Sequence, residues 1–249
     1  MLCAAAVIPL WAANPAAAKP LTAADTSAAE ILKRVDDNEV HTSVKYEGEM
    51  IIEYQNRRYV KSMNAWGREN SDSFIEFTNP EDQGTKYLKR SGRLYVYSPD
   101  NEEVMLISGH MLKESMMGSD LSYEDTVNNA TLTDRYTPTL IGTETWNGRE
   151  AWILDLTAKT KTESYPKQKL IVDIENNDLL HYELYALSGA KLKEYNLIRS
   201  EIIGGRRYPV ESEMRDLLRK GSKTTFILKN VELDITIADS VFSMRNLER

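Results

Sequence analysis

Three carboxylates, Asp120, Glu124 and Asp125, lie within six residues of each other in the stretch 113–127 (KESMMGSDLSYEDTV). Two carboxylates that face each other across a cleft can serve as general acid and base, as in glycoside hydrolysis. Carboxylates at fixed intervals in a loop can bind calcium, but these three do not match the spacing of an EF-hand loop. Hydrolysis by Asp120, Glu124 or Asp125 is therefore one hypothesis for the chain.

The rest of the sequence offers little further chemistry. The histidines His41, His110 and His181 lie far apart and form no H-E-x-x-H or other paired ligand spacing. The sequence contains no G-x-S-x-G elbow, no P-loop and no G-x-G-x-x-G motif, which removes the commonest signatures of hydrolases and nucleotide-binding proteins. We therefore expect no metal site and no cofactor, and we do not expect an enzyme.

Local structure accounts for the three acids without catalysis. A narrow apolar stripe predicts a short helix that carries Met111, Leu112, Ser115 and Met116. Gly118 is placed to end this helix as a left-handed cap. Ser122 then predicts the start of a second short helix, with Glu124 and Asp125 in the first turn, where the helix dipole favours acids. The acids are thus interpreted as caps and dipole partners.

Methionines are concentrated in the same region. Four of the nine methionines of the chain lie within thirteen residues, at Met105, Met111, Met116 and Met117. Methionine is flexible and polarizable, so such a cluster either fills an irregular core or lines a surface that accepts variable apolar partners. For the second alternative, the candidate ligand-binding residues are Met105, Met111, Leu112, Met116, Met117 and Gly118.

The first eighteen residues, MLCAAAVIPLWAANPAAA, contain no charge and end in three alanines before Lys19. Small residues at these positions are typical of a secretory cleavage site, so we predict a signal peptide over 1–18 and a single exported domain over 19–249. Cleavage would remove Cys3, the only cysteine of the chain, so the mature protein would have no disulfide and no cysteine metal site. Leu2 stands before Cys3 where a lipoprotein needs a small residue, so lipidation is not expected.

The charge of the chain argues against nucleic-acid binding. The formal net charge is −7, and basic pairs such as Arg57-Arg58 and Arg206-Arg207 are scattered among acids. Nucleic-acid binding needs a concentrated basic surface. After the leader, no segment has the roughly 18 consecutive apolar residues that a membrane-spanning helix requires.

Periodicity predicts one helix followed by many strands. Ser27 and Glu30 fit a capping box at the start of an amphipathic helix over about 27–39. From residue 46 the apolar period changes to two, and about ten to twelve short runs alternate with turn residues such as Asn147-Gly148. This order predicts a mainly β chain with a few helices and a long antiparallel meander.

A sheet of that many strands cannot stay flat, because each strand pair adds right-handed twist. We therefore predict a strongly curved antiparallel sheet, a half-open barrel whose concave face has to be covered. The two candidates for the cover are the first helix and residues 108–129, the second acting as a short helical lid.

Residues 86–125, KYLKRSGRLYVYSPDNEEVMLISGHMLKESMMGSDLSYED, resemble the outer-membrane lipoprotein-sorting family that shares the fold of the carrier LolA and the receptor LolB. Residues 235–244, ITIADSVFSM, are similar to the end of the carrier. The resemblance implies a half-barrel with a helical lid over an apolar cavity, located in the periplasm. It transfers no catalytic residues, and relatives of this subfamily are often companions of resistance-nodulation-division type transporters.

The resemblance implies a carrier or chaperone that binds lipid or lipoprotein acyl chains for transport toward the outer membrane. The alternative is a non-catalytic envelope-stress sensor or transporter accessory that recognises a protein partner, with an inner-membrane transporter of the resistance-nodulation-division type as one possible partner. A cavity that holds acyl chains favours the first hypothesis, and a cavity filled by side chains favours the second.

Overall fold

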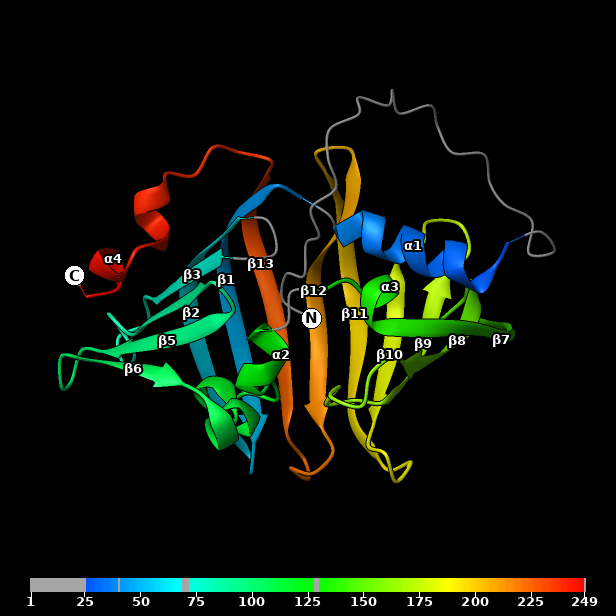
Figure 1. The fold of residues 1–249 in the computed structure, drawn as a ribbon, viewed down its shortest axis with the longest axis horizontal. Coiled ribbons are helices and arrows are strands. Elements are labelled where there is room, and N and C mark those ends of the chain that lie inside the picture. The colour runs from blue at the N-terminus through cyan, green and yellow to red at the C-terminus, as the bar shows by residue number, and fades with distance from the viewer. Residues whose placement is uncertain (1–25, 40, 69–71, 128–129, 249) are drawn as a thin grey trace.

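Most of the described chain forms one antiparallel sheet of thirteen strands, which curves into a half-open barrel (Figure 1). The computed structural model describes residues 26–39, 41–68, 72–127 and 130–248. The signal peptide over 1–18 and Cys3 lie outside these residues, so cleavage and export stay predictions. Within the described ranges, no helix combines the length and the apolar character needed to cross a membrane.

The strands follow one another mostly as hairpins. The first six are β1 (Ser43–Tyr54), β2 (Arg57–Arg68), β3 (Asp72–Phe77), β4 (Lys86–Arg90), β5 (Arg93–Ser98) and β6 (Glu103–Ile107). The other seven are β7 (Tyr136–Trp146), β8 (Arg149–Ala158), β9 (Lys167–Asp173), β10 (Leu179–Tyr185), β11 (Lys191–Ile203), β12 (Arg206–Asp216) and β13 (Lys223–Leu233). At the β7–β8 turn, Asn147 and Gly148 have φ of 50° and 81°. Two positive φ values are what a type I′ hairpin turn requires, so the hairpin predicted there is confirmed.

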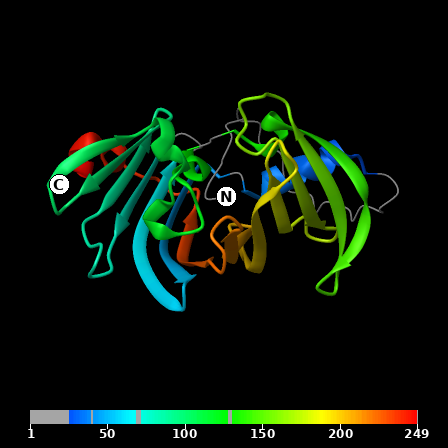
Figure 2. The ribbon, with the colours of Figure 1, turned by 90° about the horizontal axis from the view of Figure 1, so that it is seen from below.

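The strand order shows why part of the chain has to cover the sheet. β1 and β13 pair side by side in the middle, and β6 and β7 form the two edges. The chain therefore runs outward from β1 to β6, crosses to β7 at the opposite edge, and returns to the middle. A connection between opposite edges of a curved sheet must pass over one face. The first part of this connection, residues 108–127, lies over the concave face (Figure 2).

Side chains alternate along β1 as the sequence predicts. Tyr46, Met50 and Ile52 are buried, whereas Lys45 and Glu47 on either side of Tyr46 are exposed. A bulge lies beside Gly48, because the pairing of β1 with β13 shifts register between Lys45 and Glu47. The buried row of β1 therefore forms part of the floor of the concave face.

The sequence analysis does not predict β12. This strand contains Pro209, and proline is rare in central strands. Pro209 pairs with Ser200 of β11, beside a register shift. On the other side, β12 pairs with β13 only from Glu211 to Met214, so Pro209 has no opposite residue in β13. Because Pro209 has no partner in β13, its missing N–H costs no hydrogen bond between β12 and β13. Pro209 lies where these two strands separate.

The first helix, α1 (Ala28–Glu39), covers one half of the concave face (Figure 1). Its predicted start is confirmed, because the backbone N–H of Glu30 donates to Oγ of Ser27 at 3.2 Å. The side chains that α1 buries against β8, β9 and β10 are Ile31, Leu32 and Val35. A short helix, α3 (Leu132–Arg135), packs beside α1 at the end of the crossing.

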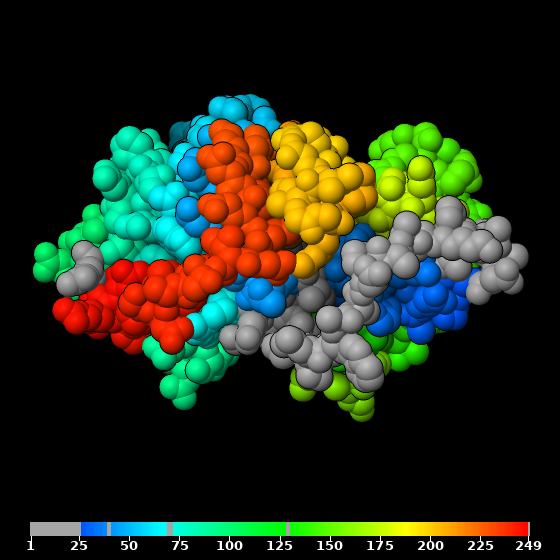
Figure 3. All heavy atoms as spheres, turned by 90° about the horizontal axis from the view of Figure 1, so that it is seen from above, coloured from blue at the N-terminus to red at the C-terminus, as the bar shows by residue number. Residues whose placement is uncertain are grey.

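The end of the chain packs on the outer face of the other half. Here η3 (Asp239–Phe242) and α4 (Met244–Leu247) place Phe242 and Leu247 against Phe74 and Leu88. Seen from above, this segment and α1 lie over opposite halves of the molecule (Figure 3). Phe242, the phenylalanine of residues 235–244 that resemble the end of the carrier, therefore belongs to a structural cluster outside the concave face.

Candidate ligand-binding site under the lid

The crossing segment over residues 108–127, which we call the lid, contains three short helical turns. These are η1 (Gly109–Lys113), η2 (Met116–Gly118) and α2 (Tyr123–Val127). The prediction of one short helix from Met111 to Met116 is wrong. The backbone is extended at Glu114 and Ser115, and Ser115 pairs with Ser122 in an antiparallel bridge.

A tight loop explains why the helix is broken. Met117 and Gly118 both have positive φ, 53° and 78°, so the chain reverses at this point. The reversal lets the N–H of Met116 donate to the carbonyl oxygen of Leu121 at 2.8 Å. Gly118 does take the predicted left-handed conformation, but it ends a turn of three residues and not a helix of two turns.

Methionines of the lid meet methionines of the sheet. Met116 is 4% exposed and packs in a cluster with Met50 and Met63 of β1 and β2. The remaining buried members of the cluster are Ile52, Phe77, Tyr87, Leu94 and Ile107. The hydroxyl of Tyr87 donates to Sδ of Met117 at 3.0 Å. The lid is thus held over an apolar floor whose side chains can change shape easily.

A small apolar hollow remains between the lid and the sheet. It has a volume of about 50 Å³, and Met50, Met63, Ala65, Ile75, Met116 and Phe226 are among the residues that line it. We call it the lid hollow. Ligand pockets usually hold about 300–1,000 Å³, so the hollow is closed to an acyl chain in this conformation.

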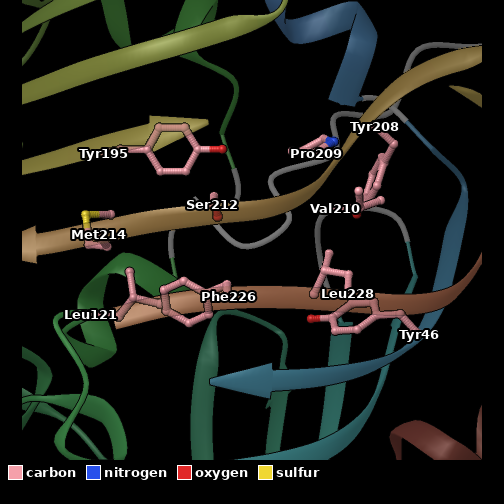
Figure 4. Close-up of a pocket in the computed structure, with 10 residues that line it drawn as sticks. All are labelled: Tyr46, Leu121, Tyr195, Tyr208, Pro209, Val210, Ser212, Met214, Phe226 and Leu228. Atoms are coloured by element: carbon pink, nitrogen blue, oxygen red, sulfur yellow. The ribbon is translucent and has the colours of Figure 1, made fainter. Parts of the chain in front are cut away.

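A second hollow of about 60 Å³ lies where β12 and β13 separate (Figure 4). Tyr208, Pro209 and Val210 line it from β12, and Tyr46, Phe226 and Leu228 line it from β1 and β13. The last three residues also line the lid hollow. The two hollows therefore share one apolar wall.

Asp120 fastens the lid to the hairpin of β12 and β13. The residue is 1% exposed. Its carboxylate accepts hydrogen bonds from Oγ1 of Thr224 at 2.6 Å, from the backbone N–H of Asp216 at 2.9 Å and from the hydroxyl of Ser222. Its own N–H donates to Thr224 Oγ1 at 2.9 Å. A buried carboxylate with this many donors is a structural anchor.

Arg219, in the same hairpin, holds the lid from the outside. Its Nη1 donates to the carbonyl oxygens of Ser119 and Gly118 at 2.6 Å and 3.0 Å, and it lies 3.3 Å from Oγ of Ser115. The guanidinium lies over the ring of Tyr54, 4.8 Å from its centroid. Asp120 and Arg219 together form what we call the latch of the lid.

Asp125 sits at the start of α2 in a buried ion pair. Its Oδ2 lies 2.6 Å from Nζ of Lys193 and accepts from the N–H and hydroxyl of Ser122 at 2.8 Å and 2.7 Å. Its Oδ1 accepts from the hydroxyl of Tyr165 at 2.8 Å. Burial by itself raises the pKa of Asp125, but Lys193 and the bonds from Ser122 outweigh it and lower the pKa. The predicted helix start at Ser122 is confirmed, with Asp125 as its capping partner.

The surroundings of Asp125 also affect Tyr165. Burial, with the neighbouring Asp125 carboxylate, raises the pKa of the Tyr165 hydroxyl well above its usual range. Tyr165 is therefore a hydrogen-bond donor to Asp125 at neutral pH. Glu124, the third acid of the stretch, accepts from Oγ of Ser164 at 2.8 Å. Each of the three acids thus has a structural partner, and the described residues hold no group of three His, Cys, Asp or Glu side chains that could bind a metal ion.

A protein-family model described as an uncharacterized protein matches residues 69–249. The chain belongs to this family. A comparison with curated proteins finds no match. Among solved structures, a DUF1329 family protein from Desulfovibrio piger is 26% identical over 88% of this chain and 97% of that chain, with a TM-score of 0.81.

Two further structures establish the type of fold. An outer membrane lipoprotein-sorting protein domain from Vibrio parahaemolyticus is 20% identical over 89% of this chain and 98% of that chain, with a TM-score of 0.78. A LolA superfamily protein from Nitrosomonas europaea is 21% identical over 89% of this chain and 100% of that chain, with a TM-score of 0.73. The resemblance found in the sequence is confirmed, and the half-barrel is a LolA-like fold.

The LolA-like fold brings together five of the six residues that the sequence singled out as ligand-binding. Met116 lines the lid hollow, and Met111, Leu112 and Met117 are half-buried beside the cluster that contains it. Gly118 is exposed at the turn behind Met116. The sixth, Met105, lies apart on edge strand β6 with 48% of its surface exposed. Their role in ligand binding stays a prediction.

The residues of the β12–β13 turn and of β13 that bind the lid were not predicted from the sequence. Arg219, Ser222 and Thr224 lie about 100 positions from their partners in the lid. Nothing in the local pattern separates Arg219 from other basic residues of exposed turns. Its role follows only from the strand order, which brings the β12–β13 turn under the crossing segment.

Proposed function

We propose that this LolA-like protein is a periplasmic carrier or chaperone that holds the acyl chains of a lipid or lipidated protein between the lid and the sheet. The observation that carries the proposal is the methionine-faced lid, with Met116 packed on Met50 and Met63. The names of the solved structures with the same fold support a role in outer-membrane lipoprotein sorting.

The energetics of acyl binding agree with a latched lid. Burying one methylene stabilises by roughly 0.8 kcal/mol, so a chain of ~14 carbons would gain on the order of 10 kcal/mol before the costs of ordering and opening. Because the lid hollow holds only about 50 Å³, cargo can enter only when the lid moves. Within the latch, Arg219 makes only three polar contacts with the lid, so these can break and re-form without disturbing the sheet.

We also propose that the protein is exported and that it works with a membrane transporter. The uncharged leader over 1–18 supports export to the periplasm. We further propose transport toward the outer membrane, with an inner-membrane transporter of the resistance-nodulation-division type as a partner that supplies the cargo. A carrier of this kind needs no catalytic step.

A second candidate function is recognition of a protein partner by a closed half-barrel, as an envelope-stress sensor or transporter accessory. The small volume of the lid hollow favours this alternative, because side chains already fill most of the concave face. In that case no lipid would copurify, and crosslinking in cells would trap a membrane protein.

Uptake of a fluorescent fatty acid by the delipidated protein, followed by native mass spectrometry, separates the two functions. We expect Met116→Asp to weaken uptake, because a carboxylate would face the apolar hollow. The matched control is Met105→Asp, the same change at an exposed methionine of edge strand β6. Met111→Asp, at a half-buried lid position, is a second variant in case Met116→Asp does not fold.

Weaker uptake by Met116→Asp or Met111→Asp, with normal uptake by Met105→Asp, would support the carrier. Equal uptake by folded variants at all three positions would remove the lid from the site. Absence of any acyl ligand from the wild-type protein, before and after incubation, would contradict the carrier and leave the protein-binding alternative.

A further inference from the structure

Three hairpin turns meet at one end of the sheet, below the lid (Figures 1 and 2). They are the β1–β2 turn at residues 55–56, the β12–β13 turn at 217–222 and the β10–β11 turn at 186–190. Strand pairing keeps them adjacent, because Glu53 of β1 pairs with Lys223 of β13 and Lys193 of β11 pairs with Asp216 of β12. We call this end of the sheet the lower rim.

Leucines project from the lower rim. Leu218 is 75% exposed, its neighbour Leu217 is 37% exposed, and Leu187 in the next turn is 84% exposed. Single exposed leucines are ordinary on protein surfaces. Polar residues and glycine usually occupy tight turns, so three leucines at the tips of two adjacent hairpins need a reason.

Cations surround these leucines. Residues 215–223 contain four lysines and arginines and one carboxylate, a net charge of +3 in a chain whose net charge is −7. Part of this charge is compensated, because Nζ of Lys223 lies 2.7 Å from Glu53 and Nε of Arg215 lies 2.8 Å from Glu213. Arg219 binds neutral carbonyl oxygens of the lid, so no carboxylate in these contacts offsets its charge.

An open surface hollow of about 570 Å³ lies among these groups. Four cations, two carboxylates and one leucine line it, so the lining keeps a net positive charge: Arg215, Arg219, Lys220, Lys223, Glu53, Asp216 and Leu217. Among the described residues, Lys220 has no ion pair within 4 Å, so its ammonium is available to an anion from outside. The hollow thus combines positive charge with an apolar edge, and its size is within the usual range for small ligands.

We infer that the lower rim docks on the surface of an anionic phospholipid membrane. The leucines at the hairpin tips enter the boundary between headgroups and acyl chains, and Lys220 and Arg219 approach the phosphates. Membrane binding of this kind grows with buried apolar area and with attraction to anionic lipids, and the rim offers both at one place. An acidic protein surface would be matched by the cations but would leave the projecting leucines unexplained.

Docking in this orientation would bring lipid phosphates close to the latch. Nη1 of Arg219 binds the carbonyl oxygens of Gly118 and Ser119 in the lid, and a phosphate is a stronger acceptor than either. The membrane surface would therefore compete with the lid for the same guanidinium. The docking proposal does not depend on the carrier function, because it concerns protein without cargo.

Cosedimentation of the delipidated mature protein with protein-free vesicles tests the proposal. We expect binding to vesicles of phosphatidylcholine mixed with phosphatidylglycerol, weak binding to phosphatidylcholine alone, and loss of binding at high salt. Lys220→Gln should weaken binding to the anionic vesicles about fivefold, the effect of one cation near the surface. Leu218→Ser should weaken it about tenfold, because it removes one of the two most exposed leucines that would enter the membrane.

Two substitutions serve as matched controls. Ile202→Ser changes a side chain that is 72% exposed in the β11–β12 hairpin, at the opposite end of the sheet. Arg245→Gln removes an exposed cation from α4 on the outer face. Both should bind anionic vesicles as the wild type does, and circular dichroism should show the same fold for all four variants.

Binding that depends on phosphatidylglycerol and is lost only in the two rim variants would establish the docking surface. No binding to anionic vesicles at low salt would overturn it, as would equal binding by all variants. Binding only to vesicles that carry membrane proteins would also overturn it and would identify the rim as a protein-binding surface. Fatty-acid uptake is measured separately, so the carrier can fail while vesicle binding persists, and the reverse.

Discussion

Nη1 of Arg219 lies 2.6 Å from the carbonyl oxygen of Ser119, although the two residues are 100 positions apart in the sequence. This contact joins the turn between β12 and β13 to the loop of the lid. It exists because the strand order places β13 in the middle of the sheet and sends the lid across the concave face. The side chain of one hairpin turn therefore controls how firmly the lid is closed.

Replacing Arg219 with glutamine should loosen the lid. The variant loses bonds to Gly118 and Ser119, and hydrogen bonds from a charged donor contribute about 1.5–3 kcal/mol. We expect faster hydrogen exchange at the amides of Met116 and Ser119, with little change in the strands. The control is Arg215→Gln, which breaks surface pairs with Glu213 and Glu194 but none with the lid. Equal exchange at the lid in both variants would show that Arg219 does not hold it.

Asp120→Asn should destabilise the whole domain. The amide keeps the shape of the carboxylate but brings an NH₂ group toward donors from Asp216, Ser222 and Thr224. A buried donor without an acceptor costs about 1–3 kcal/mol, and urea unfolding should show a loss of this size.

The control for Asp120→Asn is Glu124→Gln, whose carboxylate meets Oγ of Ser164 near the surface. A surface change of this kind is expected to stay within about 0.5 kcal/mol. If the two variants have the same midpoint in urea, the role of Asp120 as an anchor is refuted. Retention of a hydrolytic activity in Asp120→Asn would likewise separate that activity from this carboxylate.

Much of the fold could be predicted from the sequence, because its signals are local. Alternation along β1 and the capping box at Ser27 and Glu30 each depend on residues a few positions apart. The same local rules failed at Pro209, because they assume that a central strand pairs on both sides along its full length. Here β12 pairs with β13 only from Glu211 to Met214, so a proline before Glu211 is tolerated.

The candidate site was harder to predict, because its decisive contacts are long-range. The left-handed conformation of Gly118 was predicted correctly, and so was the position of Asp125 in the first turn of a helix. It could not show that Lys193, 68 positions away, would pair with Asp125. Nor could it separate Met116, which is buried, from Met105, which is exposed, because both belong to one methionine-rich stretch.

The Asp125–Lys193 pair should make stability depend on acid. Burial opposes ionisation of Asp125, but Lys193 and Ser122 outweigh it, so the pKa in the folded state lies below the usual value of an aspartate. The folded state then binds fewer protons at this group than the unfolded state. Its contribution is complete above the unfolded pKa near 4 and is lost as the pH falls through the folded pKa.

Asp125→Asn is the variant that tests this dependence. At pH 7 it leaves the buried ammonium of Lys193 without its partner, which should reduce the free energy of unfolding by about 3 kcal/mol or more. Below pH 4 the difference from the wild type should shrink, because protonation removes the same charge from the wild type. Urea unfolding at several pH values gives both curves, and parallel curves would mean that this carboxylate does not carry the acid sensitivity.

Gly118→Ala tests whether the lid needs its left-handed turn. A Cβ at this position would meet no atom within 4 Å, so the substitution causes no clash, and only the φ of 78° opposes it. An L-residue in the left-handed region costs about 1–2 kcal/mol, and we expect a loss of this size in urea unfolding. Faster exchange at the amide of Met116 should accompany it, because the reversal at Gly118 positions the bond to Leu121.

The matched control for Gly118→Ala is Gly142→Ala in β7, where a Cβ is equally free of contacts but φ is not positive. Alanine removes conformational freedom from the unfolded chain, so this variant should be neutral or more stable by up to about 1 kcal/mol. Opposite signs for the two variants would show that the backbone conformation of Gly118, and not the space around it, keeps the methionines of the lid against the sheet. Equal effects would mean that the loop can adopt another path, and that the lid does not need its left-handed turn.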